Sequence, residues 1–430
     1  MSQTSVAKGS SLAVRQMSVA LSAQIIRSPG ELLALTGPAP KQSDAEKNLR
    51  LQTDPNMPFV RISDLASDPK GDTVTVDAFN VVGGKPIMGD RNAVGLGRKL
   101  SASTFTVGID LATFNVDAGG KMSRQRARWE LRSIAKAALL AYYPRFIWQR
   151  SLTHLAGARG LQTGQSWDVP LASDPDFADI MINAVKAPTF NRHLVVNAGS
   201  VTRGGAQLGA IASTDKWKLS CLDDLSYFLD AIETKLPSPK FVGDKQATDA
   251  PLKGVLYLSP GSFNDLLTDM TAGNNLRFFQ AAAENRSKYA EESSIFAGNC
   301  GIWRGLLVRP MNHTIQHLAG SNMQYISQAN RLTENESTVS INSAIGAGNQ
   351  VERAVLLGAQ ALARAEGTSS GGLQAAIIEN TYNADRGYEY LGEFMGGEAK
   401  FRFSFPNENG DAEPTDNGVF VIDAVSPKKF

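Results

Sequence analysis

Apolar and polar residues alternate on both sides of a glycine-rich segment in the first quarter of the chain. The alternating apolar positions are Val74, Val76 and Ala78 before the segment, and Phe105, Val107, Ile109 and Leu111 after it. A period of two marks strands with one buried face, so we predict a two-stranded ribbon over residues 72–113. A lone two-stranded ribbon is only marginally stable in water. Its apolar face must therefore lie against another part of this chain or against a partner.

A long helix is predicted after the ribbon. Gly119 and Gly120 form a hinge before it, Pro144 should kink or interrupt it, and Gly157 should end it. Its apolar positions recur at helical spacing along one stripe. The stripe comprises Ala127, Leu131, Ile134, Ala135, Ala138 and Tyr142. This is the longest helix that the sequence predicts.

A shorter helix is predicted near position 220. Ser220 is placed to cap it, with Asp223 three residues later, and Pro237 should close it. Its predicted buried stripe comprises Leu222, Leu225, Leu229 and Ile232.

The middle and the end of the chain predict mixed α and β structure. The apolar run 255–258 predicts a buried strand, followed by a helix capped by Ser259 with Pro260 as its first residue. Helical structure should continue to Tyr289, with a break near Gly273. Residues 351–367 predict a further helix that ends at a glycine. A strand pair should close the chain, with Phe401, Phe403 and Phe405 alternating in one strand and residues 419–422 in the other.

Composition limits the classes of protein that fit. The chain has 430 residues, which is more than one core usually supports, so we expect two or three domains or lobes. With 43 basic and 42 acidic side chains the net charge is +1, which argues against a generally basic nucleic-acid binder but leaves room for a local basic face. The two cysteines cannot build a disulfide framework or a metal knuckle, and they favour a reducing compartment.

The first 70 residues are punctuated by proline and glycine, which predicts an arm that crosses a surface. No apolar run in the sequence has the length of a signal peptide core or a membrane span. We therefore expect a soluble intracellular protein with no membrane partner. Because neither the arm nor the ribbon buries its own face, the simplest partner for both is another copy of the chain.

Several short motifs suggest chemistry, but none forms a complete site. Gly95 and Gly97 lack the third glycine of a dinucleotide-binding loop, since Leu100 stands in that place. His313 and His317 are four residues apart, yet the glutamate of a zinc helix is missing. The acidic set Glu408, Asp411, Glu413 and Asp416 lacks the order of a calcium loop, and we interpret it as a solvated turn.

No catalytic constellation is predicted. Cys221 lies at the start of a helix, where a thiolate would be favoured, but a buried structural cysteine is the more common case. We therefore predict no catalytic, cofactor-binding or metal-binding residues.

A set of basic residues is the most suggestive feature. Arg128, Arg132 and Lys136 step by four and form a ridge beside the apolar stripe, with Arg124 and Arg126 just before them. Such a ridge could contact a polyanion through its phosphates. Pairing with acidic neighbours or simple solvation is the alternative, and we place it first.

Four segments together resemble a tailed-phage major capsid protein of the Hong Kong 97 type, specifically the coliphage N-four-like major capsid family. They are the ribbon with "GGKPIMGD", "SRQRARWELRSIAKAALLAYY" with "LTHLAGARG", "SIFAGNCGIWRGLLVRP", and the region 353–425. They occur in the family's order and span most of the chain from residue 72 onward. The first 70 residues match weakly, and residues 163–217 are particular to this chain.

The resemblance implies an α+β fold with defined parts. Residues 1–70 would be an N-terminal arm and 71–120 the extension loop, a β-hairpin that lies over an adjacent subunit. Residues 121–214 would form the peripheral domain with its spine helix, 215–372 the axial domain, and 373–430 the closing strands of the peripheral domain. At the loop tip, the residues expected to lie between subunits are Gly83, Gly84, Lys85, Asp90 and Arg91.

The function implied by the resemblance is that of a major coat protein in the virion. The protein would assemble in the host cytoplasm into an icosahedral shell of hexamers and pentamers around double-stranded DNA, without enzymatic activity or cofactor. The implied partners are further copies of the chain, a separate scaffolding protein, a portal, packaged DNA held by sequence-blind contact and, as an open option, a decoration protein.

Two other interpretations stay open at this point. The same fold could build an encapsulin-like, non-viral shell. A third possibility is an α/β nucleotide-binding enzyme with a swapped arm, which would hold an anion at the helix start near Ser259–Ser262.

Overall fold

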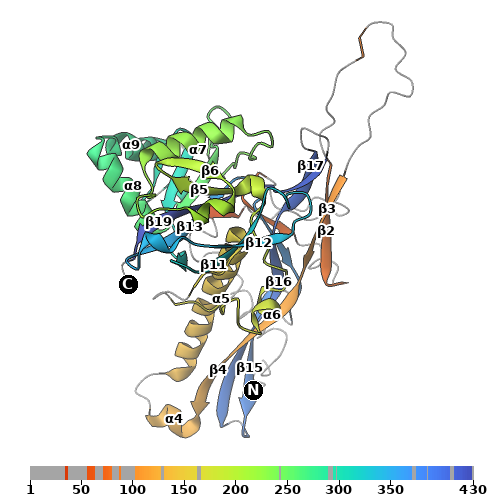
Figure 1. The fold of residues 1–430 in the computed structure, drawn as a ribbon. Helices are drawn as coiled ribbons and strands as arrows, with labels where there is room; N and C mark the ends of the chain where they lie inside the picture. The colour runs from red at the N-terminus through yellow and green to blue at the C-terminus, as the bar shows by residue number, and fades with distance from the viewer. Residues whose placement is uncertain are drawn as a thin grey trace.

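A computed structural model describes residues 34–36, 56–62, 71–79, 87–88, 102–126, 130–161, 166–241, 244–288, 294–296, 298–369, 374–384, 386–406 and 411–428. This part of the chain contains two larger sheets, three strand pairs and one long helix that contacts strands of both larger sheets (Figure 1). The first sheet, with β4, β15 and β16, lies in one part of the molecule, and the second sheet lies in another part beside helices α7, α8 and α9 (Figure 1). The structure is therefore mixed α+β, as the sequence predicts.

The first sheet is organised around one long strand, β16. Strands β15 and β14 pair with successive parts of one edge of β16, β4 pairs antiparallel along the other edge, and β1 adds in parallel to β14. The bounds are β1 Phe59–Ile62, β4 Asp110–Gly120, β14 Leu362–Glu366, β15 Ala375–Tyr382 and β16 Gly387–Lys400.

The second sheet has eight strands in the order β6-β5-β19-β13-β7-β9-β8, with β10 paired to β13. Its bounds are β5 His193–Asn197, β6 Ser200–Arg203, β7 Gly254–Leu258, β8 Gly301–Trp303, β9 Leu306–Pro310, β10 Ile315–Leu318, β13 Asn349–Leu357 and β19 Val419–Pro427. Helices α7 Leu219–Ala231, α8 Pro260–Ala272 and α9 Leu276–Ser287 contribute to the hydrophobic cluster on one face. The long helix α5, Leu131–Ala156, contributes to the cluster on the other face.

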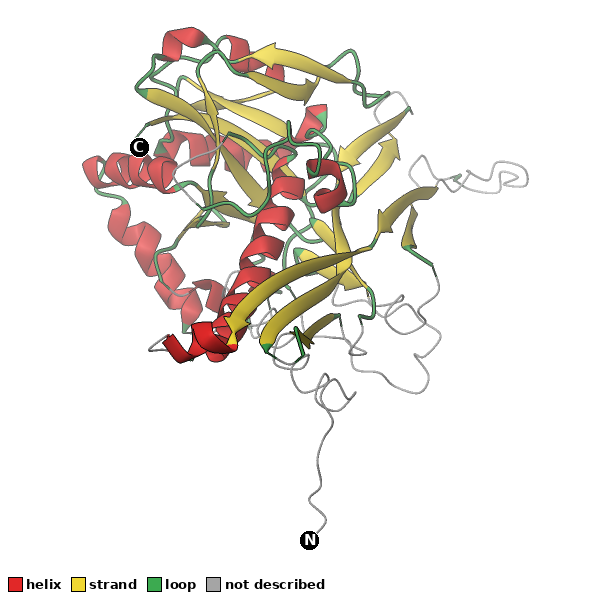
Figure 2. Ribbon diagram, turned by 90° about the horizontal axis from the view of Figure 1, so that it is seen from below, coloured by secondary structure: helices red, strands yellow, loops and turns green. Residues whose placement is uncertain are grey.

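The remaining elements are short. The strand pairs are β2 Thr73–Phe79 with β3 Ala102–Gly108, β11 Asn322–Ile326 with β12 Glu336–Ser340, and β17 Arg402–Pro406 with β18 Ala412–Asp416. The short helices are α4 Lys121–Arg126, α6 Phe177–Met181, η1 Phe190–Arg192, η2 Gly205–Gly209, η3 Ser294–Phe296 and η4 Ser343–Ile345. Figure 2 distinguishes these helices, strands and loops by colour.

The predicted ribbon is confirmed by the antiparallel pair β2–β3. Val74 and Val107 are buried in a cluster with Phe401 and Phe403, so the base of the ribbon packs on the same chain. The rings of Phe105 and Phe401 lie 5.2 Å apart. The base therefore needs no second copy to bury its apolar face.

The long helix is present, but its predicted buried stripe is partly wrong. The helix runs through Pro144, which is buried inside it, and ends at Gly157 in a left-handed conformation with φ of 65°. A Cβ on Gly157 would lie 2.5 Å from the carbonyl oxygen of Lys186, which leaves no room for a side chain. Ile134 is 50% exposed, whereas Leu139 is fully buried. The buried face is rotated because the helix lies on β16 and β4 as well as on the second sheet.

The helix predicted over 351–367 is wrong, because this segment forms strands β13 and β14 in two different sheets. Both strands are buried along nearly their whole length, so the apolar residues 354–357 run without interruption instead of alternating. A continuous apolar run cannot be distinguished from a buried helix by periodicity. The predicted closing pair is also wrong, because β17 pairs with β18 while β19 joins the second sheet.

The predicted strand 255–258 and the helices around Gly273 are confirmed, including the cap by Ser259 and the first-turn Pro260. The predicted cap of α7 is wrong. Lys218 holds the cap position, and the first amide of the helix, that of Leu219, donates to the Asp269 carboxylate of α8 at 2.8 Å. A carboxylate from a neighbouring helix thus does what the sequence assigns to Ser220.

Candidate assembly surfaces

Two members of the predicted basic ridge are described, and both contact their own chain. Arg132 lies 2.6 Å from Glu379, donates to the Tyr390 hydroxyl at 3.1 Å, and lies 4.1 Å over the ring of Tyr388. Lys136 lies 3.9 Å from the same glutamate. These contacts tie the start of α5 to β15 and β16.

The ridge keeps some access to solvent, because both of its described side chains are 35% exposed. The hydrogen bond to Tyr390, together with the charge of Glu379, raises the pKa of the Arg132 guanidinium, so it stays charged. Arg128 and the side chain of Arg124 lie outside the described residues.

The predicted loop-tip residues Gly83, Gly84, Lys85, Asp90 and Arg91 also lie outside the described residues. Between β2 and β3 the structure describes residues 87 and 88. These are the apolar side chains Ile87, which is 41% exposed, and Met88, which is 70% exposed. The described part of the loop thus presents apolar surface to solvent.

The anion site that the nucleotide-binding interpretation requires is filled by the protein itself. At the start of α8, the hydroxyl groups of Ser259 and Ser262 and the backbone N–H of Ser262 all donate to the carboxylate of Glu352. Burial raises the pKa of this carboxyl group, while the hydrogen bonds oppose the rise. A buried carboxylate at this position excludes a phosphate from it, so this interpretation loses its site.

The two candidate metal histidines do not form a site. His317 lies on β10 and is buried beside Arg353, so burial and the guanidinium lower the pKa of its imidazole to about 3. His313 packs edge-on against Trp167, 5.5 Å between ring centres. Within the described residues, no three side chains of the metal-binding types come together.

Cys221 and Asp416, which the sequence analysis considered for chemistry, are both buried. Burial raises the pKa of the Cys221 thiol, which makes it a poor nucleophile. Asp416, which the sequence places in a solvated turn, is fully buried.

Among the helices that the structure describes, none is long and apolar enough to cross a membrane.

A buried charge network in the second sheet was missed by the sequence analysis. Arg353 on β13 donates to both oxygens of Asp423 on β19, at 2.8 and 2.9 Å, and to the last carbonyl of α5 at 2.9 Å. His193 on β5 lies 2.7 Å from the same carboxylate. Although burial opposes it, the guanidinium holds the pKa of Asp423 well below its usual range. The Arg353–Asp423 ion pair and its hydrogen bonds therefore link strands β5, β13 and β19 to the end of α5.

A second buried network joins the end of β16 to the β17–β18 pair and to the turn between β11 and β12. Asp416 lies 3.0 Å from Lys400 and 2.8 Å from Arg402, which also reaches Glu334 at 2.9 Å. Burial opposes ionisation of Asp416, yet the two cations lower its pKa to about 2. Burial lowers the pKa of Lys400 to about 8. A charge inside an apolar strand, as in "VFVIDAV", is the sequence signal that could have revealed such pairs.

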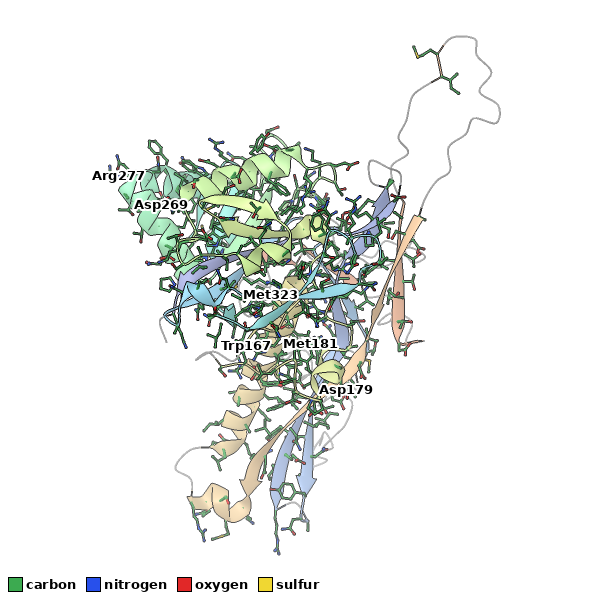
Figure 3. The ribbon with its side chains drawn as sticks, viewed as in Figure 1. Trp167, Asp179, Met181, Asp269, Arg277 and Met323 are labelled. Atoms are coloured by element: carbon green, nitrogen blue, oxygen red, sulfur yellow. The ribbon has the colours of Figure 1, made fainter. Side chains whose placement is uncertain are left out.

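An open groove of about 410 Å³ lies between β4, α5 and α6. We call it the aromatic groove. Phe114, Tyr142 and Phe146 form its floor, with Phe114 and Tyr142 stacked at 4.0 Å. Its rim is acidic and contains Asp110, Asp168, Asp176 and Asp179. Figure 3 labels Asp179, which comes from α6.

The arrangement as a whole matches solved phage capsids. The capsid of Ralstonia phage GP4 superposes with a TM-score of 0.67 at 21% identity and covers 91% of this chain and 93% of its own. The cyanophage Pam1 capsid gives 0.56 at 16% identity, covering 92% and 96%. The capsid of Helicobacter pylori bacteriophage KHP30 gives 0.53 at 11% identity, covering 87% and 89%. No match is found among curated proteins.

The chain shares the mixed α+β, Hong Kong 97-like fold of these solved phage capsids. A model of the phage capsid protein family matches residues 5–428, so the chain belongs to that family. Its function is that of a phage major capsid protein, which forms the shell of the virion from capsomers. The main interpretation therefore stands over the encapsulin-like and enzyme alternatives.

Proposed function

We propose that the arm, residues 1–70, and the long loop within 71–120 of one subunit lie on neighbouring subunits of the shell. The observation that carries the proposal is the contrast between the two parts of the ribbon. Its base is buried on its own chain, whereas Ile87 and Met88 are exposed to solvent. Weak contacts that are shared among many copies add up to a stable assembly.

Negative-stain microscopy combined with sedimentation tests this proposal. We expect capsomers, sheets or closed shells when magnesium or a crowding agent is added to the purified chain. A stable monomer or dimer under all conditions would refute it.

We further propose the division of the chain that the resemblance implies. Residues 121–214 and 373–430 would form the peripheral domain and 215–372 the axial domain, in a protein of the coliphage N-four-like subfamily. The eight-stranded sheet also takes strands from 193–203 and 419–427, so the domains would share chain segments at their junction. Limited proteolysis of assembled shells tests the division, because domain boundaries should be cut before the sheet interior.

The proposed partners are a separate scaffolding protein, a portal, an optional decoration protein and double-stranded DNA, with assembly in the host cytoplasm. The near-neutral net charge of +1 supports a lining that tolerates dense DNA without binding it tightly.

Reversing the charge of Arg128 and Arg132 tests the role of the basic ridge. Normal assembly with lost packaging would assign the ridge to DNA, whereas failed assembly would assign it to subunit pairing. The contact of Arg132 with Glu379 supports pairing within the subunit as its first role.

The glycines of the loop, among them Gly83 and Gly84, would let the loop change direction as a precursor shell expands. Replacing these two residues with proline should block expansion. Particles that reach the normal diameter after packaging would contradict this role.

A further inference from the structure

The aromatic groove has the properties of a docking site. Its floor is apolar, with Leu111 still 43% exposed and Phe114 38% exposed at its edge. The ring of Tyr142 stacks between Phe114 and Phe146, at 4.0 and 5.8 Å, so the floor is a continuous aromatic surface. Exposed apolar surface of this kind, rimmed by polar groups, marks interaction sites.

The charge of the rim restricts what can bind there. Of its four aspartates, Asp168 is paired with Arg145, at 2.5 and 2.7 Å. Asp110, Asp176 and Asp179 have no cation among the described residues. The groove therefore fits a segment that has apolar side chains at its centre and basic side chains on either side.

The long loop of the ribbon has this composition. Ile87 and Met88 lie in its first half, between Lys85 and Arg91, and the loop sequence, residues 80–101, has four basic side chains against one acidic side chain. The basic residues are Lys85, Arg91, Arg98 and Lys99, and the acidic one is Asp90. A methionine thioether packs well against aromatic rings.

The groove that the loop would enter belongs to another subunit. Figure 1 draws residues 87–88 as the short orange segment inside the grey trace at the top, far from β4 and α6 of the same chain. We propose that the aromatic groove of one subunit binds the tip of the long loop of a neighbouring copy, with Ile87 and Met88 on the aromatic floor. This inference rests on the proposed function, in which the long loop crosses to a neighbour.

Disulfide trapping in assembled shells tests the pairing. We would combine Met88→Cys with Ile180→Cys, because Ile180 lines the groove. The native Cys221 and Cys300 are buried and should not interfere. The matched control combines Met88→Cys with Tyr227→Cys, since Tyr227 is 71% exposed on α7, away from the groove.

We expect mild oxidation to give cross-linked ladders with at least tenfold more product for the groove pair than for the control pair. Shells of normal size with no such excess would overturn the docking inference and leave the proposed function intact. A groove cysteine that cross-links instead to Val14→Cys would assign the groove to the N-terminal arm, which also overturns it. Failure of the unmodified chain to assemble would instead refute the proposed function.

Charge reversal gives a second test that needs no oxidation. Asp176→Lys with Asp179→Lys should slow shell assembly at least tenfold, and Lys85→Glu with Arg91→Glu in the same chain should restore it. The control is Asp249→Lys, an exposed residue outside the groove. Equal assembly rates for the rim double variant and the control would overturn the inference.

Discussion

Acid should destabilise the folded subunit between pH 6.5 and pH 5 through its buried histidines. His154 lies in the core and His317 beside the central ion pair, and burial lowers the pKa of each imidazole from 6.5 to about 3. Neighbouring cations add to this, Arg150 for His154 and Arg353 for His317. In this range the unfolded chain binds protons that the folded chain does not bind, so the free energy of unfolding falls as the pH falls.

The magnitude follows from the two pKa values. At pH 5 the pH is 1.5 units below the unfolded pKa of each histidine and still above the folded pKa. At about 1.4 kcal/mol per unit, each histidine therefore lowers the free energy of unfolding by about 2 kcal/mol. The two together should remove about 4 kcal/mol between pH 8 and pH 5. This is a large part of the typical stability of about 5–15 kcal/mol of a folded protein.

Guanidinium unfolding of the unassembled protein at pH 8, 6.5 and 5 provides the assay. His317→Gln keeps a polar side chain without the titration, so it should remove about 2 kcal/mol of the pH dependence. Glu352→Gln is a useful companion variant, because the raised pKa of this glutamate works in the opposite direction. A free energy of unfolding that is constant within about 1 kcal/mol from pH 8 to pH 5 would refute the reasoning.

Three further outcomes are expected. Arg353→Met should lower the free energy of unfolding by about 3–5 kcal/mol, because it leaves the buried Asp423 carboxylate without its guanidinium partner. Arg304→Ala at an exposed pair should cost less than about 1 kcal/mol in the same denaturation assay. Gly397→Ala should sharply reduce the yield of folded protein, since its Cβ would lie 1.9 Å from a backbone oxygen of the ribbon base, while Gly348→Ala has open space and should match the parent in thermal unfolding. The Cys221 thiol should resist Ellman's reagent until the protein is denatured, and rapid labelling of the native chain would contradict its burial.

Local sequence patterns predicted the elements that have one buried and one exposed face, and the helix ends that are marked by adjacent residues. The alternation around Val74 and Val107 identified the ribbon, because one of its faces is buried and the other is exposed. The cap at Ser259 and the break at Gly273 are marked by residues that are adjacent in the sequence, so the sequence was sufficient to predict both.

Elements buried on both faces were not predictable in this way. Strand β13 lies between α5 on one face and α7 and α8 on the other, so residues 354–357 are all apolar and show no alternation. The cap of α7 failed for a related reason, because Asp269 reaches it from fifty residues away. Long-range partners of this kind leave no local trace.

The candidate surfaces show the same limit. The acidic rim of the aromatic groove is assembled from β4, the loop after α5 and the α6 region, which no sequence window contains together. The basic ridge was visible as a step of four, but its partner Glu379 stands 247 residues further along the chain.

The way the two sheets are threaded has a consequence for synthesis in the infected cell. The first sheet pairs β4 with β16, and the second pairs β5 with β19, so neither sheet is complete until the last strands have left the ribosome. At about 5–20 residues per second, the 430 residues take roughly 20–90 s to make. A chain that terminates early lacks β19 and cannot complete its second sheet. Chains that end before β19 should therefore fail to fold completely and should not enter the shell.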